Sequence, residues 1–282
     1  QIIKSFDIES NWYINNKDSL NSNYKNINSV LICGMGGSAI GGELAKIMLS
    51  KNIKVPMSVN RSSIIPNWVD SNTLIIISSY SGNTYETIES FQLSRKKTKK
   101  IIAISSNSGA INSFCLEYGY PVINVPSGLQ PRCALGYISS IIILILVRLN
   151  LTSSSRKIRR QIKDSFYELE HVDSMLKEDN NPILSMSYKI KNSTPVIYGF
   201  ENSTSVAALR FKNQLQENAK TVSFCNNFPE INHNEIESWS NKNKTFFIIW
   251  LKDSSLKDKD VKSFNAALTL IDNLKIKQEV IS

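Results

Sequence analysis

The chain has 282 residues, 41% of them hydrophobic, which is enough to bury the core of one large domain or of two ordinary ones. Its net charge of +9 favours anionic partners, but the basic runs at 94–100 and 154–160 contain no aromatic residues and no nucleic-acid motif, so we expect no nucleic-acid partner. The longest apolar segment, 135–151, contains two serines and is interrupted by Arg148, so we expect a buried helix there and not a membrane span.

The first half of the chain alternates short apolar strands with longer amphipathic segments. Strands are predicted where β-branched runs are followed by Gly, Ser or Asn, at 29–33, 54–59, 73–78, 101–105 and 121–125. Helices are predicted between and after them, at 38–50, 84–98, 109–118, 130–150 and 156–178. Near-continuous apolar strands that alternate with helices are typical of a parallel sheet covered on both faces. We therefore expect a doubly wound α/β fold.

The second half of the chain repeats the layout of the first. Residues 195–215 follow the pattern of residues 30–49, which is a strand, a turn of small residues and a helix. Residues 244–264 follow the pattern of residues 72–91 in the same way. These two correspondences predict a two-fold internal repeat.

The repeat predicts three parts of the chain. They are a first subdomain over 1–153, a connecting helix and linker over 154–185, and a second subdomain over 186–282. Ligands of doubly wound sheets bind beyond the carboxyl ends of the strands. The loops that follow the strands are therefore where a functional site is expected.

The first of these loops is the glycine-rich stretch GMGGSAIGG at 34–42. Gly34, Gly36 and Ala39 match the form G-x-G-x-x-G/A of a dinucleotide-binding turn. That turn also needs an acidic residue about twenty positions later, whereas the second predicted strand ends in NRSS, without an acid. The stretch is thus a nucleotide site, a site for a smaller phosphate, or a tight turn that needs glycine for backbone reasons alone.

The second loop, SSYSGNTYET at 78–87, places four serine and threonine hydroxyl groups within seven residues. They belong to Ser78, Ser79, Ser81 and Thr84. A helix is predicted to begin beside them, and helix N-terminal amides together with hydroxyl groups bind phosphate oxygens. An ordinary helix cap with serine turns is the alternative, but one cap needs fewer hydroxyl groups.

Three further residues are candidates for chemistry. Glu217 lies near the end of a predicted helix, and His233 follows in a loop between two asparagines. A carboxylate and a histidine suit proton transfer, although a surface glutamate and a loop histidine remain equally compatible with the spacing. Arg132 follows the fifth predicted strand in a loop stiffened by Pro131.

The cysteines give no indication of a metal site. They are scattered along the chain at Cys33, Cys115, Cys133 and Cys225, and no pair has metal-ligand spacing. We therefore expect free thiols in a reducing compartment. Separately from the cysteines, we expect a cytoplasmic protein that needs neither a metal nor a cofactor.

Four segments taken together resemble one family. In chain order, GMGGSAIGG, SSYSGNTYET, PSGLQPRCALGY and NQLQENAK…FPEINHNEI are similar to motifs of the archaeal-type bifunctional phosphoglucose/phosphomannose isomerases, members of the sugar isomerase (SIS) superfamily. The resemblance runs from about residue 27 to about residue 275. It implies two flavodoxin-like subdomains with parallel sheets in a three-layer α/β/α arrangement, and a homodimer without metal.

The resemblance also implies roles for particular residues. The phosphate of a hexose 6-phosphate would be bound by Gly37, Ser38, Ser79, Ser81 and Thr84. Glu217 would move a proton between C1 and C2, and Arg132 would lie beside the enediolate. His233 would open the sugar ring from across a dimer interface, binding substrate of the neighbouring subunit.

The activity implied is interconversion of glucose 6-phosphate, fructose 6-phosphate and mannose 6-phosphate. Chains of the family continue into a helix with a ring-opening lysine, so we expect the second subdomain to be truncated at Ser282. A non-catalytic phosphosugar-binding regulator is the alternative, and it would not need Glu217 and His233 together. A nicotinamide-dependent oxidoreductase is disfavoured by the missing ribose-binding acid.

Overall fold

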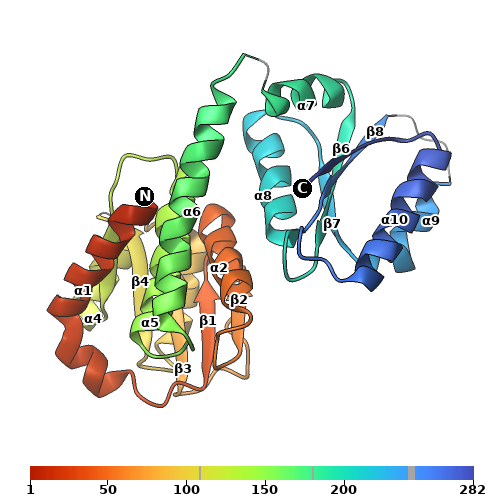
Figure 1. Cartoon of the computed structure of the whole chain (residues 1–282). Helices are drawn as coiled ribbons and strands as arrows, with labels where there is room; N and C mark the ends of the chain where they lie inside the picture. Colours follow the sequence, from red (N-terminus) through yellow and green to blue (C-terminus); the bar gives the residue numbers. More distant parts are fainter. Residues whose placement is uncertain (108, 180, 241–244) are drawn as a thin grey trace. The chain divides into compact units, whose positions relative to one another are not determined.

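The computed structural model describes residues 1–107, 109–179, 181–240 and 245–282. The chain divides into two compact units, Gln1–His171 and Val172–Ser282, and each is described by itself (Figure 1). The division falls within helix α6 (Ser155–Leu176), inside the segment 154–185 that we expected to connect two subdomains. Among the described residues, no helix is both long enough and apolar enough to span a membrane.

The first unit is built on a five-stranded sheet in the order β2-β1-β3-β4-β5, with every neighbouring pair parallel. The strands are β1 (Ser29–Cys33), β2 (Met57–Asn60), β3 (Thr73–Ser78), β4 (Ile101–Ser106) and β5 (Val122–Val125). All residues of β1, β3 and β4 are buried. Burial on both faces explains why these three strands are apolar almost without interruption.

Helices cover both faces of this sheet, as the alternating side chains of β1 show. Val30 and Ile32 belong to a cluster that includes residues of α1 (Ile2–Asn23), α2 (Gly36–Leu49) and α5 (Leu135–Arg148). Leu31 and Cys33 point the other way and join a cluster with residues of α3 (Tyr85–Ser94) and α4 (Ala110–Tyr118). The expected three-layer α/β/α arrangement is therefore present.

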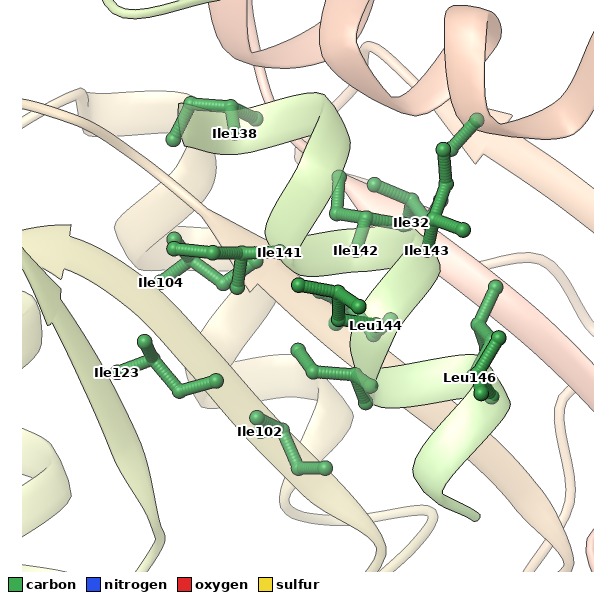
Figure 2. Packing of buried hydrophobic residues seen from close by; sticks show 14 of the residues in the cluster. Ile32, Ile102, Ile104, Ile123, Ile138, Ile141, Ile142, Ile143, Leu144 and Leu146 are labelled. Atoms are coloured by element: carbon green, nitrogen blue, oxygen red, sulfur yellow. The ribbon is translucent and has the colours of Figure 1, made fainter. Parts of the chain in front are cut away.

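Helix α5 is the central element of the larger cluster. Residues 137–147 of this helix are all buried, because the helix packs on the sheet and also against α1 and α2. Figure 2 shows its isoleucines and leucines in contact with Ile32, Ile102, Ile104 and Ile123 from three strands. The apolar segment 135–151 is thus a core helix, as expected.

The predicted helix over 130–150 is two helices in the structure. A short 3-10 helix, η1 (Pro131–Cys133), precedes α5, and Ala134 separates the two. Pro131 has no N–H group to continue an α-helical ladder, so it begins a helix instead of extending one. The break places Arg132 on a tight turn in front of the core helix.

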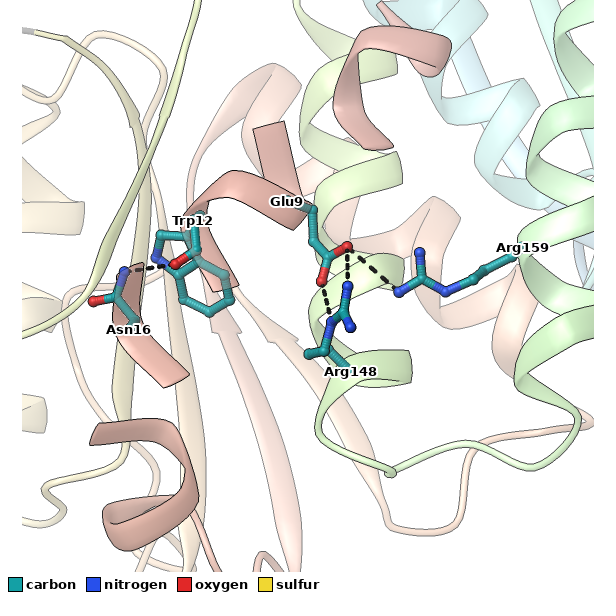
Figure 3. Close-up of polar contacts among 5 residues, drawn as sticks. All are labelled: Glu9, Trp12, Asn16, Arg148 and Arg159. Carbon is teal, nitrogen blue, oxygen red and sulfur yellow. Dashed lines mark hydrogen bonds and ion pairs between the residues drawn. The ribbon is translucent and has the colours of Figure 1, made fainter. Parts of the chain in front are cut away.

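A buried carboxylate connects three helices of the first unit (Figure 3). Glu9 of α1 has no exposed side-chain surface and accepts hydrogen bonds from Arg148 of α5, at 2.6 Å from Nε and 3.1 Å from Nη2. Arg159 of α6 approaches the same carboxylate at 3.4 Å. The Arg148 guanidinium also stacks 4.2 Å from the ring centre of Tyr13. These contacts attach α1 to the two helices that follow the sheet.

The second unit contains four parallel strands in the order β7-β6-β8-β9. They are β6 (Thr194–Phe200), β7 (Phe224–Phe228), β8 (Phe246–Leu251) and β9 (Lys277–Ile281). Its helices are α7 (Pro182–Ile190), α8 (Ser205–Asn218), η2 (Glu230–His233), α9 (Glu235–Ser238) and α10 (Asp258–Asn273). Both faces of the sheet are covered, one by residues of α10 and α9 and the other by residues of α7 and α8.

The internal repeat predicted from the sequence is confirmed by the strand order. In each unit the first strand lies between the second and the third, giving β2-β1-β3 in one sheet and β7-β6-β8 in the other. The segment pairs that we matched, 30–49 with 195–215 and 72–91 with 244–264, contain the corresponding strands β1, β6, β3 and β8. Lys244, at the start of the last segment, lies outside the described residues.

Candidate functional site

The strand order of the first unit marks one position at the carboxyl edge of its sheet. The chain passes from β1 to β2 on one side, and β3 lies on the other side of β1. A ligand of a doubly wound sheet binds where the order reverses in this way, beyond the carboxyl ends of the two diverging strands. Here those strands lead into the glycine turn and into the serine-rich loop.

The glycine turn packs tightly against its neighbours. A side chain on Gly34 would come within 2.8 Å of the main-chain oxygen of Ser78, at the end of β3. A side chain on Gly37 would lie 3.1 Å from the main-chain oxygen of Pro131 and 3.5 Å from the Cα atom of Arg132. Glycine therefore allows the turn to approach both the serine-rich loop and the loop that carries Arg132.

Three hydroxyl groups of the serine-rich loop are close to one another. The Ser79 hydroxyl donates to Thr84 Oγ1 at 3.2 Å, and Ser81 Oγ lies 3.5 Å from the same atom. Ser38, in the first turn of α2, is joined to this loop because its hydroxyl accepts the Tyr80 N–H at 3.4 Å. The structure thus brings the hydroxyl groups of Ser79, Ser81 and Thr84 together. Ser78, the fourth predicted hydroxyl of this loop, is instead fully buried at the end of β3.

Two helices present their N-termini to this group of hydroxyls. Thr84 is the N-cap of α3, and Met35 is the N-cap of α2. Neither helix has a side-chain hydrogen bond at its cap. Amide groups at two helix N-termini are thus left to bind a ligand, and their partial positive charge favours an anion.

Sequence reasoning missed two residues that shape the serine-rich loop. Tyr80 is buried, whereas Ser81, the next residue in the chain, is exposed. The Tyr80 hydroxyl forms hydrogen bonds with the loop before Arg132. Gly109 is the N-cap of α4, with φ +106° and ψ 167°, a backbone conformation that only glycine adopts readily. In the sequence, the dipeptide Ser-Gly at 108–109 indicates a turn at Gly109. Nothing in the sequence indicates that Gly109 contacts a loop about 27 residues earlier.

Replacing Gly109 with Ala is expected to weaken phosphate binding. The new Cβ would lie 2.6 Å from the main-chain oxygen of Ser81 and 2.8 Å from Gly82, so the serine-rich loop must move or the backbone of residue 109 must relax. We expect the affinity for inorganic phosphate, measured by calorimetric titration, to fall about tenfold, with a loss of about 2 kcal/mol in the free energy of unfolding.

Gly119 provides the matched control for this substitution. It ends the same helix in the left-handed conformation at φ +72°, and a side chain there would have no neighbour within 4 Å. Gly119→Ala should cost about 1 kcal/mol in the free energy of unfolding through backbone strain. Its phosphate affinity should equal that of the unsubstituted chain. Equal affinities in the two variants would contradict the role assigned to Gly109.

The remaining candidates lie on the second unit, at opposite edges of its sheet. Glu217 is exposed in the last turn of α8, where its main-chain oxygen accepts a hydrogen bond from Lys220 Nζ at 2.7 Å. Because α8 joins the neighbouring parallel strands β6 and β7, it runs against their direction (Figure 1). Its C-terminal end therefore lies at the edge where those strands begin, whereas His233 follows the carboxyl end of β7.

The turn that carries His233 is attached to the sheet through Glu235. The Glu235 carboxylate accepts hydrogen bonds from Tyr198 of β6, at 2.6 Å, and from Asn226 of β7. The indole N–H of Trp239 donates to the Tyr198 hydroxyl at 3.0 Å. Burial and the Glu235 carboxylate raise the pKa of Tyr198, so its hydroxyl remains a proton donor. His233 itself is exposed at the end of η2, two residues before this anchor.

At the strand-order reversal of the second unit, a carboxylate stands beside the helix N-terminus. Ser203, two residues before α8 begins, donates its hydroxyl hydrogen bond to Asp253, which follows β8. The other Asp253 oxygen accepts from the main-chain N–H and the hydroxyl of Ser255, both at 2.7 Å. This edge therefore differs in charge from its counterpart in the first unit, where hydroxyl groups and uncapped amides are found.

The structure thus places some of the candidate residues close together and leaves others on separate units. Gly37, Ser38, Ser79, Ser81, Thr84 and the Arg132 loop come together at one edge of the first sheet. Glu217 and His233 belong to the second unit. Within the described residues, no three His, Cys, Asp or Glu side chains form a group that could hold a metal ion.

The fold places the chain in the class of α/β proteins with two parallel-sheet units of the SIS type. The C-terminal domain of glucosamine-fructose-6-phosphate aminotransferase from Francisella tularensis superimposes with a TM-score of 0.71 at 17% sequence identity, over 91% of this chain and 72% of that one. At this identity the likeness establishes the fold alone. Residues 179–281 also match the family described as bacterial phospho-glucose isomerase C-terminal SIS domain.

Sequence comparison narrows the class to one family. A bifunctional phosphoglucose/phosphomannose isomerase from Caldicellulosiruptor bescii is 40% identical over 240 residues, which cover 84% of this chain and 68% of that protein. A D-glucosamine-6-phosphate 4-epimerase from Sulfolobus acidocaldarius is 30% identical over 224 residues, or 79% of this chain and 68% of that protein. The chain belongs to the bifunctional phosphoglucose/phosphomannose isomerase family, which confirms the resemblance found in its motifs.

Proposed function

We propose that the protein is an aldose–ketose isomerase that interconverts glucose 6-phosphate and fructose 6-phosphate, and also accepts mannose 6-phosphate. Family membership supports the reaction class. The single structural observation that carries the substrate class is the group of hydroxyls and two uncapped helix N-termini at the strand-order reversal of the first sheet. Such a group binds the phosphate of a sugar without any positively charged side chain.

The proposed reaction is proton transfer between two neighbouring carbons. Glu217 removes the proton from C2 of the open-chain aldose and returns it to C1, through a cis-enediolate, while the hydroxyl proton of O2 passes to O1. The Arg132 guanidinium stabilises the negative charge that develops on the enediolate oxygens. Phosphate binding at Ser79, Ser81 and Thr84 supplies binding energy away from the reacting carbons, and this energy orients C1 and C2 toward the base.

Hexose 6-phosphates are mostly closed rings, so a ring-opening step must come first. We assign it to His233, which protonates the ring oxygen while the anomeric hydroxyl loses its proton. Glu217 and His233 of one chain lie at opposite edges of the second sheet. This separation supports the proposal that the protein is a homodimer and that His233 serves the active site of the neighbouring subunit.

A coupled assay tests the proposed function. With fructose 6-phosphate as substrate, formation of glucose 6-phosphate is followed through a dehydrogenase, and mannose 6-phosphate is tested in parallel. Glucosamine 6-phosphate is included because one relative is named as a 4-epimerase of that sugar. We expect turnover of fructose 6-phosphate and mannose 6-phosphate, which carry no amino group. Binding of these sugars without turnover would instead support a phosphosugar-binding regulator, and turnover of the amino sugar alone would support an epimerase.

A further inference from the structure

Tyr80 connects the serine-rich loop to the loop that carries Arg132. Its side chain is 5% exposed, and its hydroxyl donates a hydrogen bond to the main-chain oxygen of Pro126 at 2.8 Å. The same hydroxyl accepts the main-chain N–H of Leu129 at 3.0 Å. A single hydroxyl oxygen therefore holds both ends of the segment 126–129, which ends three residues before Arg132.

The main chain of Tyr80 is held as firmly as its hydroxyl. Its N–H donates to the Ser38 hydroxyl at 3.4 Å, and its carbonyl accepts the N–H of Ser106 at 3.0 Å. The Tyr80 ring belongs to the core cluster that also contains Ala134 and Tyr137, on the far side of Arg132 in the chain. The residue is thus fixed at the sheet, at the glycine turn and at the core helix.

The segment that Tyr80 holds has no regular structure of its own. Residues 126–130 lie between β5 and η1, and Gly128 adopts φ +90°. A segment of this kind depends on bonds from other elements to keep one conformation. Both hydrogen bonds of the Tyr80 hydroxyl are formed with main-chain atoms of this segment. They therefore constrain the position of the segment whatever side chains it carries.

We infer that Tyr80 is a positioning residue that sets the place of Arg132 relative to the bound phosphate. Its neighbours in the chain, Ser79 and Ser81, belong to the group that holds the phosphate, and its hydroxyl holds the loop that leads to Arg132. The inference rests on the proposed function, in which Arg132 stabilises the enediolate. A guanidinium stabilises developing charge only when it is held in place before the charge forms.

Tyr80→Phe tests this inference because it removes the hydroxyl and keeps the ring. For fructose 6-phosphate we expect kcat to fall about tenfold, because small displacements of a catalytic group cost large factors in rate. KM and the dissociation constant of inorganic phosphate should change less than about twofold, since the phosphate-binding hydroxyls stay in place. Amide hydrogen exchange of residues 127–134, measured by mass spectrometry, should become faster.

Tyr24→Phe is the matched control. Tyr24 is 7% exposed in the same core cluster, and its hydroxyl donates to the main-chain oxygen of Ile101 at 2.6 Å. Ile101 begins β4, so this bond lies at the opposite edge of the sheet from the Arg132 loop. The control should lose a similar free energy of unfolding while keeping kcat and the exchange of residues 127–134 unchanged.

A double-substitution cycle separates positioning from general destabilisation. If Tyr80 acts through Arg132, then Tyr80→Phe should lower kcat by less than about twofold when Arg132 is already replaced with Lys. If Tyr80→Phe lowered kcat by the same factor with Arg132 present and with Arg132 replaced by Lys, the inference would be overturned. An active Tyr80→Phe variant with unchanged kcat would also overturn it. An inactive unsubstituted chain would reject the proposed function instead. In that case unchanged exchange of residues 127–134 in Tyr80→Phe would still overturn the assignment of Tyr80.

Discussion

Glu217→Gln is expected to lower kcat for fructose 6-phosphate isomerisation by about a thousandfold or more. The amide has the shape of the carboxylate but cannot accept the C1 proton of the ketose, and a general base contributes factors of about 10²–10⁴ in rate. Because Glu217 is assigned to the chemical step alone, the dissociation constant for fructose 6-phosphate should change little. The coupled assay measures kcat, and calorimetric titration measures the dissociation constant.

Glu201→Gln is the control for this variant, because Glu201 is also an exposed glutamate of the second unit. It should keep both kcat and affinity. A Glu217→Gln chain that retains more than about a tenth of the unsubstituted kcat would exclude Glu217 as the base. Loss of sugar binding together with activity would indicate that Glu217 acts in binding, which the proposed mechanism does not require.

Glu9→Ala is expected to lower the free energy of unfolding by about 3 kcal/mol. Breaking a buried ion pair leaves the partner charge uncompensated, and such losses range from about 3 to 5 kcal/mol. The lower end applies here because the side chains of Arg148 and Arg159 keep 27% and 28% of their surface exposed. Denaturant unfolding of the whole chain, followed at the transition of the first unit, measures the loss.

Glu43→Ala gives the comparison for Glu9. Glu43 forms a pair with Arg61 at 2.8 Å, but both side chains are partly exposed, at 20% and 39%. Surface pairs of this kind contribute less than about 1 kcal/mol. If Glu9→Ala and Glu43→Ala lowered the free energy of unfolding equally, burial of Glu9 would not make its ion pairs more stabilising than a surface pair. A salt dependence confined to Glu43 would agree with the difference in burial.

Strands β1, β3, β4 and β5 were predicted to within about one residue at each end, but β2, predicted at 54–59, begins only at Met57. Helix α1 was not predicted at all. Burial on both faces makes β1 and β3 continuous apolar runs, which stand out in a sequence. Helix α1 buries Ser5 and Glu9 along with Trp12 and Leu20, so its inward face shows no apolar periodicity. The buried Glu9 carboxylate of this helix is paired with Arg148 and Arg159, about 140 and 150 residues away. No pattern in the local sequence indicates partners at such a distance.

The same distinction applies to the candidate site. The loops after the strands were predicted to hold the site because ligands of doubly wound sheets bind beyond the carboxyl ends of the strands, and the grouping of the glycine turn with the serine-rich loop came from the family resemblance. The roles of Tyr80 and Gly109 were missed because each depends on a main-chain contact with a distant segment, at Pro126 and at Ser81. Assignment of Glu217 and His233 to one reaction still comes from the family resemblance.

Asp253 has a consequence for how many sugars the protein holds. Its carboxylate follows β8, the strand that corresponds to β3 of the first unit, and Ser203 and Ser255 already donate to it. An incoming phosphate there would meet a negative charge of the protein itself. Under the proposed function we therefore expect one hexose phosphate per polypeptide, bound at the edge of the first sheet and not at Asp253.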